Sequence, residues 1–174
     1  MTDLREQLRQ CLVDRVCFLA LGNVDYGDDG FGVRLGERLI AAGISDVTIA
    51  GTTPERYLGA LARERFGHAV FLDAVEFGGA AGSVVFLDAS AIVAKFPQVS
   101  THKIALSTLA QWLEANGTQT WLLGVEPVSL KPGQRLTETV ESTLDALSSL
   151  LQSLGPQPSF PGAPASQPIA EACT

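Results

Sequence analysis

The composition describes one compact domain without a basic surface. The chain has 174 residues, 46% hydrophobic and 18% charged, enough for one sizeable core but not for two domains. Its net charge of −7 and the absence of a Lys/Arg cluster argue against nucleic acid, and no apolar run reaches the ~20 residues of a membrane helix. With mixed charges and no targeting pattern at the N-terminus, we expect a cytoplasmic protein with no membrane partner.

The first predicted elements are a short helix over residues 4–14 and a strand over 16–21. The strand, VCFLAL, is a continuous apolar run, as expected for a strand that is buried on both faces. A helical spacing of apolar residues then runs from Phe31 to Gly43. The segment LGNVDYGDDGFG (21–32) therefore joins the carboxyl end of a strand to the start of a helix, where open α/β sheets usually bind ligands.

The rest of the chain repeats this alternation. We predict strands at 47–51, 69–74, 83–88 and 120–125, helices at 55–66, 104–115 and 134–154, and a loop over 89–101. Only eight residues separate the third strand from the fourth, fewer than a parallel crossover needs, so the fourth strand should run antiparallel to the third. Five strands and about four helices predict a helix-sheet-helix sandwich of the α/β class.

The two ends of the chain and its cysteines add little chemistry. Residues 155–174 contain five prolines and little to bury, so we predict a single domain over 1–154 followed by a disordered tail. Cys11, Cys17 and Cys173 are odd in number and lack metal-type spacing, which favours reduced thiols. Cys17 should be a small core residue.

Two adjacent carboxylates, Asp28 and Asp29, stand among four glycines in the first loop. Glycines permit tight turns and the close approach of another backbone. One acid could cap the following helix, but that leaves the other unexplained. A nucleotide loop is a second alternative, although two carboxylates would repel a pyrophosphate and no phosphate-loop motif is present.

Asp73 and two histidines are the other candidates for chemistry. Asp73 ends the apolar run AVFLDA, where an ionised carboxylate is costly without a partner and the local sequence offers none; the alternative is a hydrogen bond to neighbouring loop amides. His68 begins the same strand at the opposite end, so we expect a surface or edge residue. His102, in VSTHKIAL, precedes a helix, and its significance depends on whether it joins the acids.

Two carboxylates and one imidazole suit a divalent ion such as Ni²⁺ or Zn²⁺. Their separation along the chain is not a local metal motif, so spacing alone proves no site. No serine lies in a GxSxG setting and no cysteine is placed with a histidine and an orienting acid, which argues against a nucleophilic hydrolase. Acid and metal chemistry remain.

Several segments resemble the NiFe-hydrogenase maturation proteases, which remove a C-terminal peptide from the hydrogenase large-subunit precursor after nickel insertion. LGNVDYGDDGFGVR resembles the opening motif of that family. Further matching segments follow in the family's order between residues 16 and 152: AGTTPE, AVFLDAVEFGGAAGSV, STHKIAL and LLGVEPVSLKPGQRLTETV. The resemblance implies one twisted, mostly parallel five-stranded sheet with helices on both faces.

The resemblance also implies roles for individual residues. The family's metal-binding acids and histidine fall on Asp29, Asp73 and His102, and Asp29 and Asp73 would be the catalytic acids; the role of Asp28 stays open. The metal would be nickel supplied by the active site of the precursor, with no organic cofactor. The partner would be the C-terminal region of the large-subunit precursor. A chaperone that binds the precursor without cutting it is the alternative.

Overall fold

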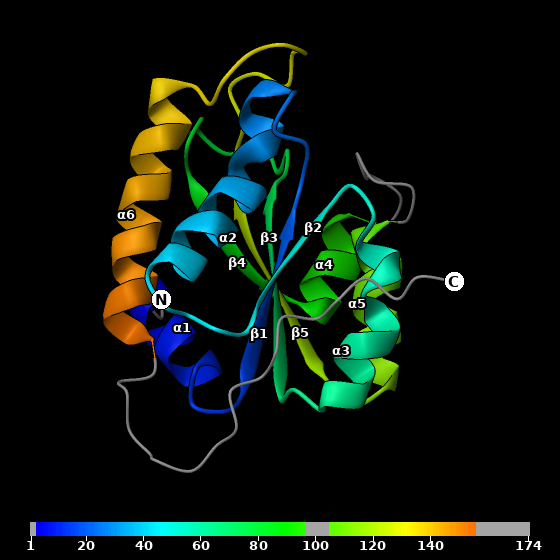
Figure 1. Cartoon of the computed structure of the whole chain (residues 1–174). Coiled ribbons are helices and arrows are strands. Elements are labelled where there is room, and N and C mark those ends of the chain that lie inside the picture. Colours follow the sequence, from blue (N-terminus) through cyan, green and yellow to red (C-terminus); the bar gives the residue numbers. More distant parts are fainter. Residues whose placement is uncertain (1–2, 97–104, 156–174) are drawn as a thin grey trace.

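The fold is a single mixed sheet between two layers of helices (Figure 1). The structure is a computed structural model that describes residues 3–96 and 105–155. The strand order is β2-β1-β3-β5-β4. The parallel strands are β1 (Val16–Leu21), β2 (Val47–Gly51), β3 (His68–Ala74) and β5 (Gln119–Val125), and β4 (Val84–Asp88) pairs antiparallel with β5. The predicted α/β class, with five strands of which one is antiparallel, is confirmed.

Each face of the sheet has its own hydrophobic core. One face is covered by α1 (Leu4–Cys11), α2 (Phe31–Ala41) and α6 (Glu138–Leu154), and the other by α3 (Leu58–Glu64), α4 (Ala89–Lys95) and α5 (Leu106–Ala115) (Figure 1). Along β1, Phe18 and Ala20 enter the first core, whereas Cys17 and Leu19 enter the second. Because successive side chains of a strand point to opposite faces, helices on both sides require the unbroken apolar run seen in the sequence.

The main error in the predicted elements is α4, which occupies part of the expected loop over 89–101. Asp88 begins this helix as its N-cap, with its carboxylate accepting the N–H of Ala91 at 2.8 Å. That hydrogen bond, with one from Ser90, lowers the pKa of Asp88 below its ordinary value. An acid at the last position of β4 was the available signal for this helix.

The fourth strand has the predicted direction but a different neighbour. It runs antiparallel to β3, as expected, yet β5 lies between the two strands and pairs with β4. The predicted proline-rich tail beyond Gly155 and the candidate ligand His102 lie outside the described residues. The tail and the domain boundary therefore stay predictions.

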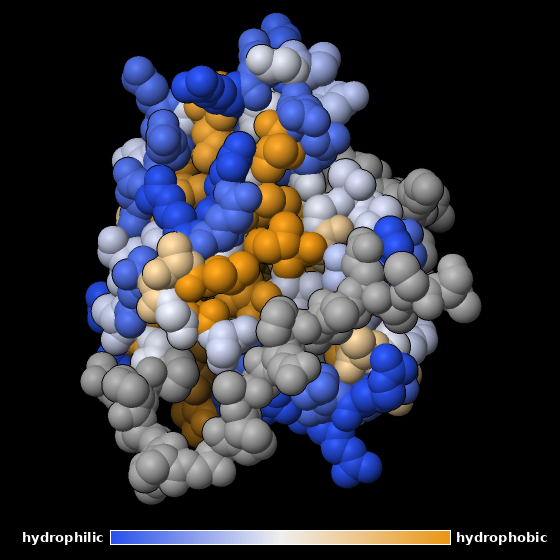
Figure 2. All heavy atoms as spheres, viewed as in Figure 1, coloured by the Kyte–Doolittle hydropathy of each residue, from blue (hydrophilic) through white to orange (hydrophobic). Residues whose placement is uncertain are grey.

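One face of the molecule carries a band of hydrophobic residues. In Figure 2 these residues gather over α2 and β2 and are surrounded by hydrophilic ones. Strand β2 is an edge of the sheet, and Ile44, Val47 and Ile49 are only partly buried against the first core.

Within residues 3–96 and 105–155, no helix combines the length and the apolar character that a membrane span requires.

The burial of Cys11 and Cys17 predicts unreactive thiols. Both are buried and free, as expected for Cys17, and burial raises the pKa of each thiol to about 12. Both thiols are therefore neutral at pH 8, and only thiolates react rapidly with a disulfide reagent. In a Cys173→Ser variant, titration with Ellman's reagent should find no rapidly reacting thiol in the native protein and two after unfolding. Rapid reaction of the native variant would contradict this burial.

Candidate functional site

The acidic loop lies where the sequence placed it, at the carboxyl end of the parallel strands. GDDG forms one 3-10 turn (Gly27–Gly30) that leads directly into α2. Asp73 lies on the neighbouring strand, because β1 and β3 are parallel with Ala20 opposite Leu72. The topology therefore brings the expected acids, Asp29 and Asp73, to the same edge of the sheet.

Gly22 shows how closely the two acidic segments approach. A Cβ atom at this glycine would lie 1.8 Å from the carbonyl oxygen of Asp29 and 3.8 Å from Oδ1 of Asp73. The backbone of Gly22 also has φ +110°, in the region that favours glycine. Gly22 therefore lets the turn that carries Asp29 lie directly against the end of β1, beside the carboxylate of Asp73.

The carboxylate of Asp29 is buried and only half satisfied. Its side chain is 5% exposed, and Oδ2 accepts the N–H of Asn23 at 2.8 Å. Oδ1 is also buried, but it has no hydrogen-bond partner among the described residues. A buried carboxylate oxygen without a partner is costly, so this atom is suited to a group that arrives with a ligand: a cation, a proton or a water molecule.

Asp73 is also buried, at 2% exposure, but it has a local partner. Its Oδ1 accepts the N–H of Ala74 at 2.9 Å. The expectation that the surrounding sequence offers no partner was therefore wrong, and this amide belongs to the last residue of β3 and not to the neighbouring loop of the alternative. A backbone amide favours the ionised carboxylate, so this bond is compatible with an acid that binds a cation or accepts a proton.

A cavity opens beside Asp29. Its volume is about 390 Å³, and it is lined by Asn23, Tyr26, Asp29, Thr52 and Leu130. The first three residues follow β1, Thr52 follows β2 and Leu130 follows β5. The segments that follow three strands therefore line one cavity, in which the carboxylate of Asp29 lies with the side chains of Tyr26 and Leu130. Such a cavity can bind an extended peptide segment next to a proton-accepting group.

Asp28 does not cap α2, so the capping interpretation of the acidic pair was wrong. Neither the 3-10 turn nor α2 has a side-chain cap. The fully buried carboxylate of Asp28 instead accepts hydrogen bonds from the segment that follows β5, including Thr137. These partners are about a hundred residues away in the sequence, and no local pattern could have revealed them.

His68 was expected to be a surface or edge residue, but it is 8% exposed and β3 lies in the middle of the sheet. Its Nδ1 accepts the indole N–H of Trp121 at 3.0 Å, and its Nε2 lies 3.4 Å from the carboxylate of Asp14. It does begin β3 at the end opposite Asp73, as predicted. This histidine therefore takes no part in the acid site.

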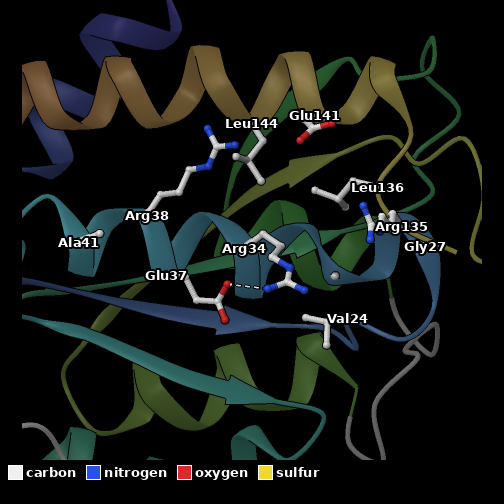
Figure 3. Close-up of a pocket in the computed structure, with 11 residues that line it drawn as sticks. Val24, Gly27, Arg34, Glu37, Arg38, Ala41, Arg135, Leu136, Glu141 and Leu144 are labelled. Atoms are coloured by element: carbon white, nitrogen blue, oxygen red, sulfur yellow. Dashed lines mark hydrogen bonds and ion pairs between the residues drawn. The ribbon is translucent and has the colours of Figure 1, made fainter. Parts of the chain in front are cut away.

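A second cavity, of about 600 Å³, lies between α2 and α6 (Figure 3). Val24, Gly27 and Gly30 of the acidic loop line it, together with residues of both helices and Arg135. Arg34 forms an ion pair with Glu37 at 3.0 Å, and Arg38 pairs with Asp145. The two carboxylates that line this cavity, Glu37 and Glu141, are both exposed, so it offers no buried proton acceptor comparable to Asp29.

The expected set of three metal ligands stays a prediction. His102 lies outside the described residues, so its position relative to the acids is not given by the structure. Among the residues described, no group of three or more His, Cys, Asp and Glu side chains could hold a metal ion. The free Oδ1 of Asp29 does fit a ligand role, because carboxylate oxygen and imidazole nitrogen are donors that a divalent nickel ion accepts.

Comparisons with known proteins give the family and the fold of the chain. Residues 33–153 match the sequence profile of the hydrogenase maturation protease family, HycI. The hydrogenase 2 maturation protease of Escherichia coli is 31% identical over 150 residues, covering 80% of this chain and 90% of that protein. The crystal structure of the HycI NiFe-hydrogenase maturation protease of Thermococcus kodakarensis superposes with a TM-score of 0.75 at 30% identity, covering 85% of this chain and 97% of that one. The hydrogenase-maturating endopeptidase HybD of E. coli gives a TM-score of 0.68 at 29% identity, covering 80% and 91%.

Proposed function

Because the chain belongs to the hydrogenase maturation protease family, it is a hydrolase that cuts a peptide bond, and we propose that it does so with an acid centre at Asp29 and Asp73. The substrate is the nickel-loaded large-subunit precursor of a NiFe hydrogenase, from which the protein removes a C-terminal peptide. The observation that carries this proposal is the buried Oδ1 of Asp29, which faces no partner among the described residues and belongs to a side chain that lines the 390 Å³ cavity.

Peptide hydrolysis needs a group that moves a proton. Water adds to the scissile carbonyl carbon, the carbon–nitrogen bond breaks, and the proton lost by the water reaches the leaving amine. Oδ1 of Asp29 supports the role of proton acceptor, because it is buried beside the cavity and has a free lone pair. Asn23 fixes the orientation of the same carboxylate through its bond to Oδ2, and Asp73 places a second acid next to the turn.

Nickel enters this proposal as part of the substrate. Asp29, Asp73 and His102 are the residues that would hold it, and the bound ion would polarise the scissile carbonyl or lower the pKa of the attacking water. The support from the structure is the unsatisfied Oδ1 of Asp29 and the close approach of the backbone turn that carries Asp29 to the carboxylate of Asp73. Contact with the nickel of the precursor would let the protein distinguish loaded from unloaded substrate.

The proposed location is the cytoplasm. Cys11 and Cys17 are free thiols in the described part of the chain, and free thiols suit a reducing compartment. The net charge of −7 makes a nucleic-acid partner unfavourable. The proposed partner is the large-subunit precursor of the hydrogenase.

A turnover experiment separates a protease from a chaperone. A small molar fraction of the protein is incubated with nickel-loaded precursor, and intact-mass spectrometry measures the precursor over time. We expect release of a C-terminal peptide in molar excess over the protein added. A stable one-to-one complex with precursor of unchanged mass would overturn the protease and support the chaperone.

A further inference from the structure

Asp28 is a fully buried acid that the proposed mechanism does not use. Its side chain is 0% exposed, and every partner lies on the segment between β5 and α6. Oδ2 accepts the N–H of Val128 at 2.8 Å and that of Ser129 at 3.0 Å, while Oδ1 accepts the N–H of Thr137 at 2.7 Å. The hydroxyl of Thr137 lies 3.1 Å from Oδ1 and 3.0 Å from Oδ2. This carboxylate is therefore saturated by hydrogen bonds and is not available for proton transfer.

Thr137 shows that the contact replaces an ordinary helix cap. It is the N-cap of the 17-residue helix α6 and has the extended backbone that a cap adopts, yet its hydroxyl makes no capping bond. The hydroxyl points to Asp28 instead, so the carboxylate stands at the positive end of α6. The hydroxyl of this N-cap residue bonds Asp28 and not the first backbone N–H groups of α6, which indicates that the structure requires the carboxylate of Asp28 at this position.

Backbone hydrogen bonds reinforce the same connection. The N–H of Asp28 donates to the carbonyl of Ser129 at 2.9 Å, the N–H of Gly27 to that of Gln134 at 3.1 Å, and the N–H of Gly133 to that of Asp25 at 2.7 Å. The acidic turn and the 128–137 segment therefore form one bonded unit with Asp28 at its centre.

This unit carries both sides of the candidate site. Asp29 directly follows Asp28, and Leu130 directly follows the bonded pair Val128 and Ser129; Asp29 and Leu130 line the same cavity. We propose that Asp28 is a positioning residue of the protease, which holds the carboxylate of Asp29 and the cavity wall at Leu130 in register. The predicted effect of Asp28 on the rate of peptide release rests on the proposed function. Its predicted effect on the geometry of Asp29 does not.

The matched pair Thr137→Val and Thr137→Ser tests this role. Valine removes only the hydroxyl bonds to Asp28, whereas serine keeps them. With nickel-loaded precursor, well below the Tm of each variant, Thr137→Val should lower kcat by about 10-fold with KM little changed, because small misplacements of a reacting group are costly. Thr137→Ser should keep the parent kcat. A parent kcat in Thr137→Val with a lowered Tm would overturn the inference and leave Asp28 as a structural residue.

A second readout does not depend on the precursor. The amide of Asn23 donates to Oδ2 of Asp29, so its hydrogen exchange reports whether that carboxylate is held in place. Relative to the amide of Val70 in the central strand β3, the Asn23 amide should exchange faster in Thr137→Val and at the parent rate in Thr137→Ser. Equal exchange in both variants would contradict positioning.

The substitution Asp28→Asn extends the test. It keeps the shape of the side chain but turns an NH2 donor toward backbone N–H donors, so kcat should fall by about 100-fold and Asn23 should exchange faster than in Thr137→Val. If this variant does not fold, the Thr137 pair alone decides. If the parent protein releases no peptide, the proposed function has failed, and the exchange of Asn23 still decides whether Asp28 positions Asp29.

Discussion

Asp29→Asn should abolish peptide release from nickel-loaded precursor and leave the fold intact. The amide oxygen can still accept the N–H of Asn23, but the atom that replaces the free Oδ1 can neither accept a proton nor bind a cation well. Loss of a positioned acid or base typically costs about 10²- to 10⁴-fold in rate. The unfolding free energy should change by no more than about 1 kcal/mol, because Oδ1 makes no hydrogen bond to the described residues.

The matched control for Asp29→Asn is Asp25→Asn. Asp25 belongs to the same loop and loses the same charge, but its side chain is exposed. Mass-spectrometric rates of peptide release should be at the parent level for Asp25→Asn and undetectable for Asp29→Asn, with similar thermal unfolding of both. Processing by Asp29→Asn at the parent rate would remove Asp29 from the mechanism.

Gly32→Ala should cause the largest loss of stability. Gly32 lies in α2, where the helix crosses the carboxyl ends of the central strands. An added Cβ would lie 1.9 Å from the carbonyl oxygen of Leu72 and 2.4 Å from that of Leu21. These are backbone atoms of β3 and β1, so the helix itself must move, at a cost of about 3 kcal/mol or more. For a chain of this size the Tm should fall by roughly 6 to 12 °C.

Gly59→Ala provides the control because it makes the same substitution in another helix. A Cβ at Gly59 would meet only Nη1 of Arg63, at 3.7 Å. Alanine should therefore raise the unfolding free energy by about 0.5–1 kcal/mol through its better helix propensity. Scanning calorimetry of both variants gives the comparison. A Gly32→Ala protein as stable as the parent would mean that α2 does not pack this closely on the sheet.

Most of the fold could be predicted because the local pattern and the tertiary environment demand the same residues. Short segments rich in apolar residues marked β1 and β2 with the bounds that the structure has, and the other three strands within one residue. Helix α4 was missed because a short helix with few periodic positions gives little signal, and its capping acid, Asp88, is also the last residue of β4.

In the candidate site, too, the features that follow from the strand pattern could be predicted, whereas those that depend on residues far away in the sequence could not. The common edge of Asp29 and Asp73 follows from the parallel pairing of β1 and β3, which the strand pattern implied. The burial of His68 was not predictable, because it depends on the strand order, which places β3 between β1 and β5. The partners of Asp28 were also not predictable, since Thr137 is separated from it by 109 residues.

We expect this protein to cut only a precursor that already contains nickel. The direct measurement is intact-mass spectrometry of nickel-loaded and nickel-free large-subunit precursor from the same organism, each incubated with the protein under the same conditions. Only the loaded precursor should lose a C-terminal peptide. Equal cleavage of both forms would contradict the recognition of nickel by Asp29, Asp73 and His102, and cleavage of neither would contradict the protease itself.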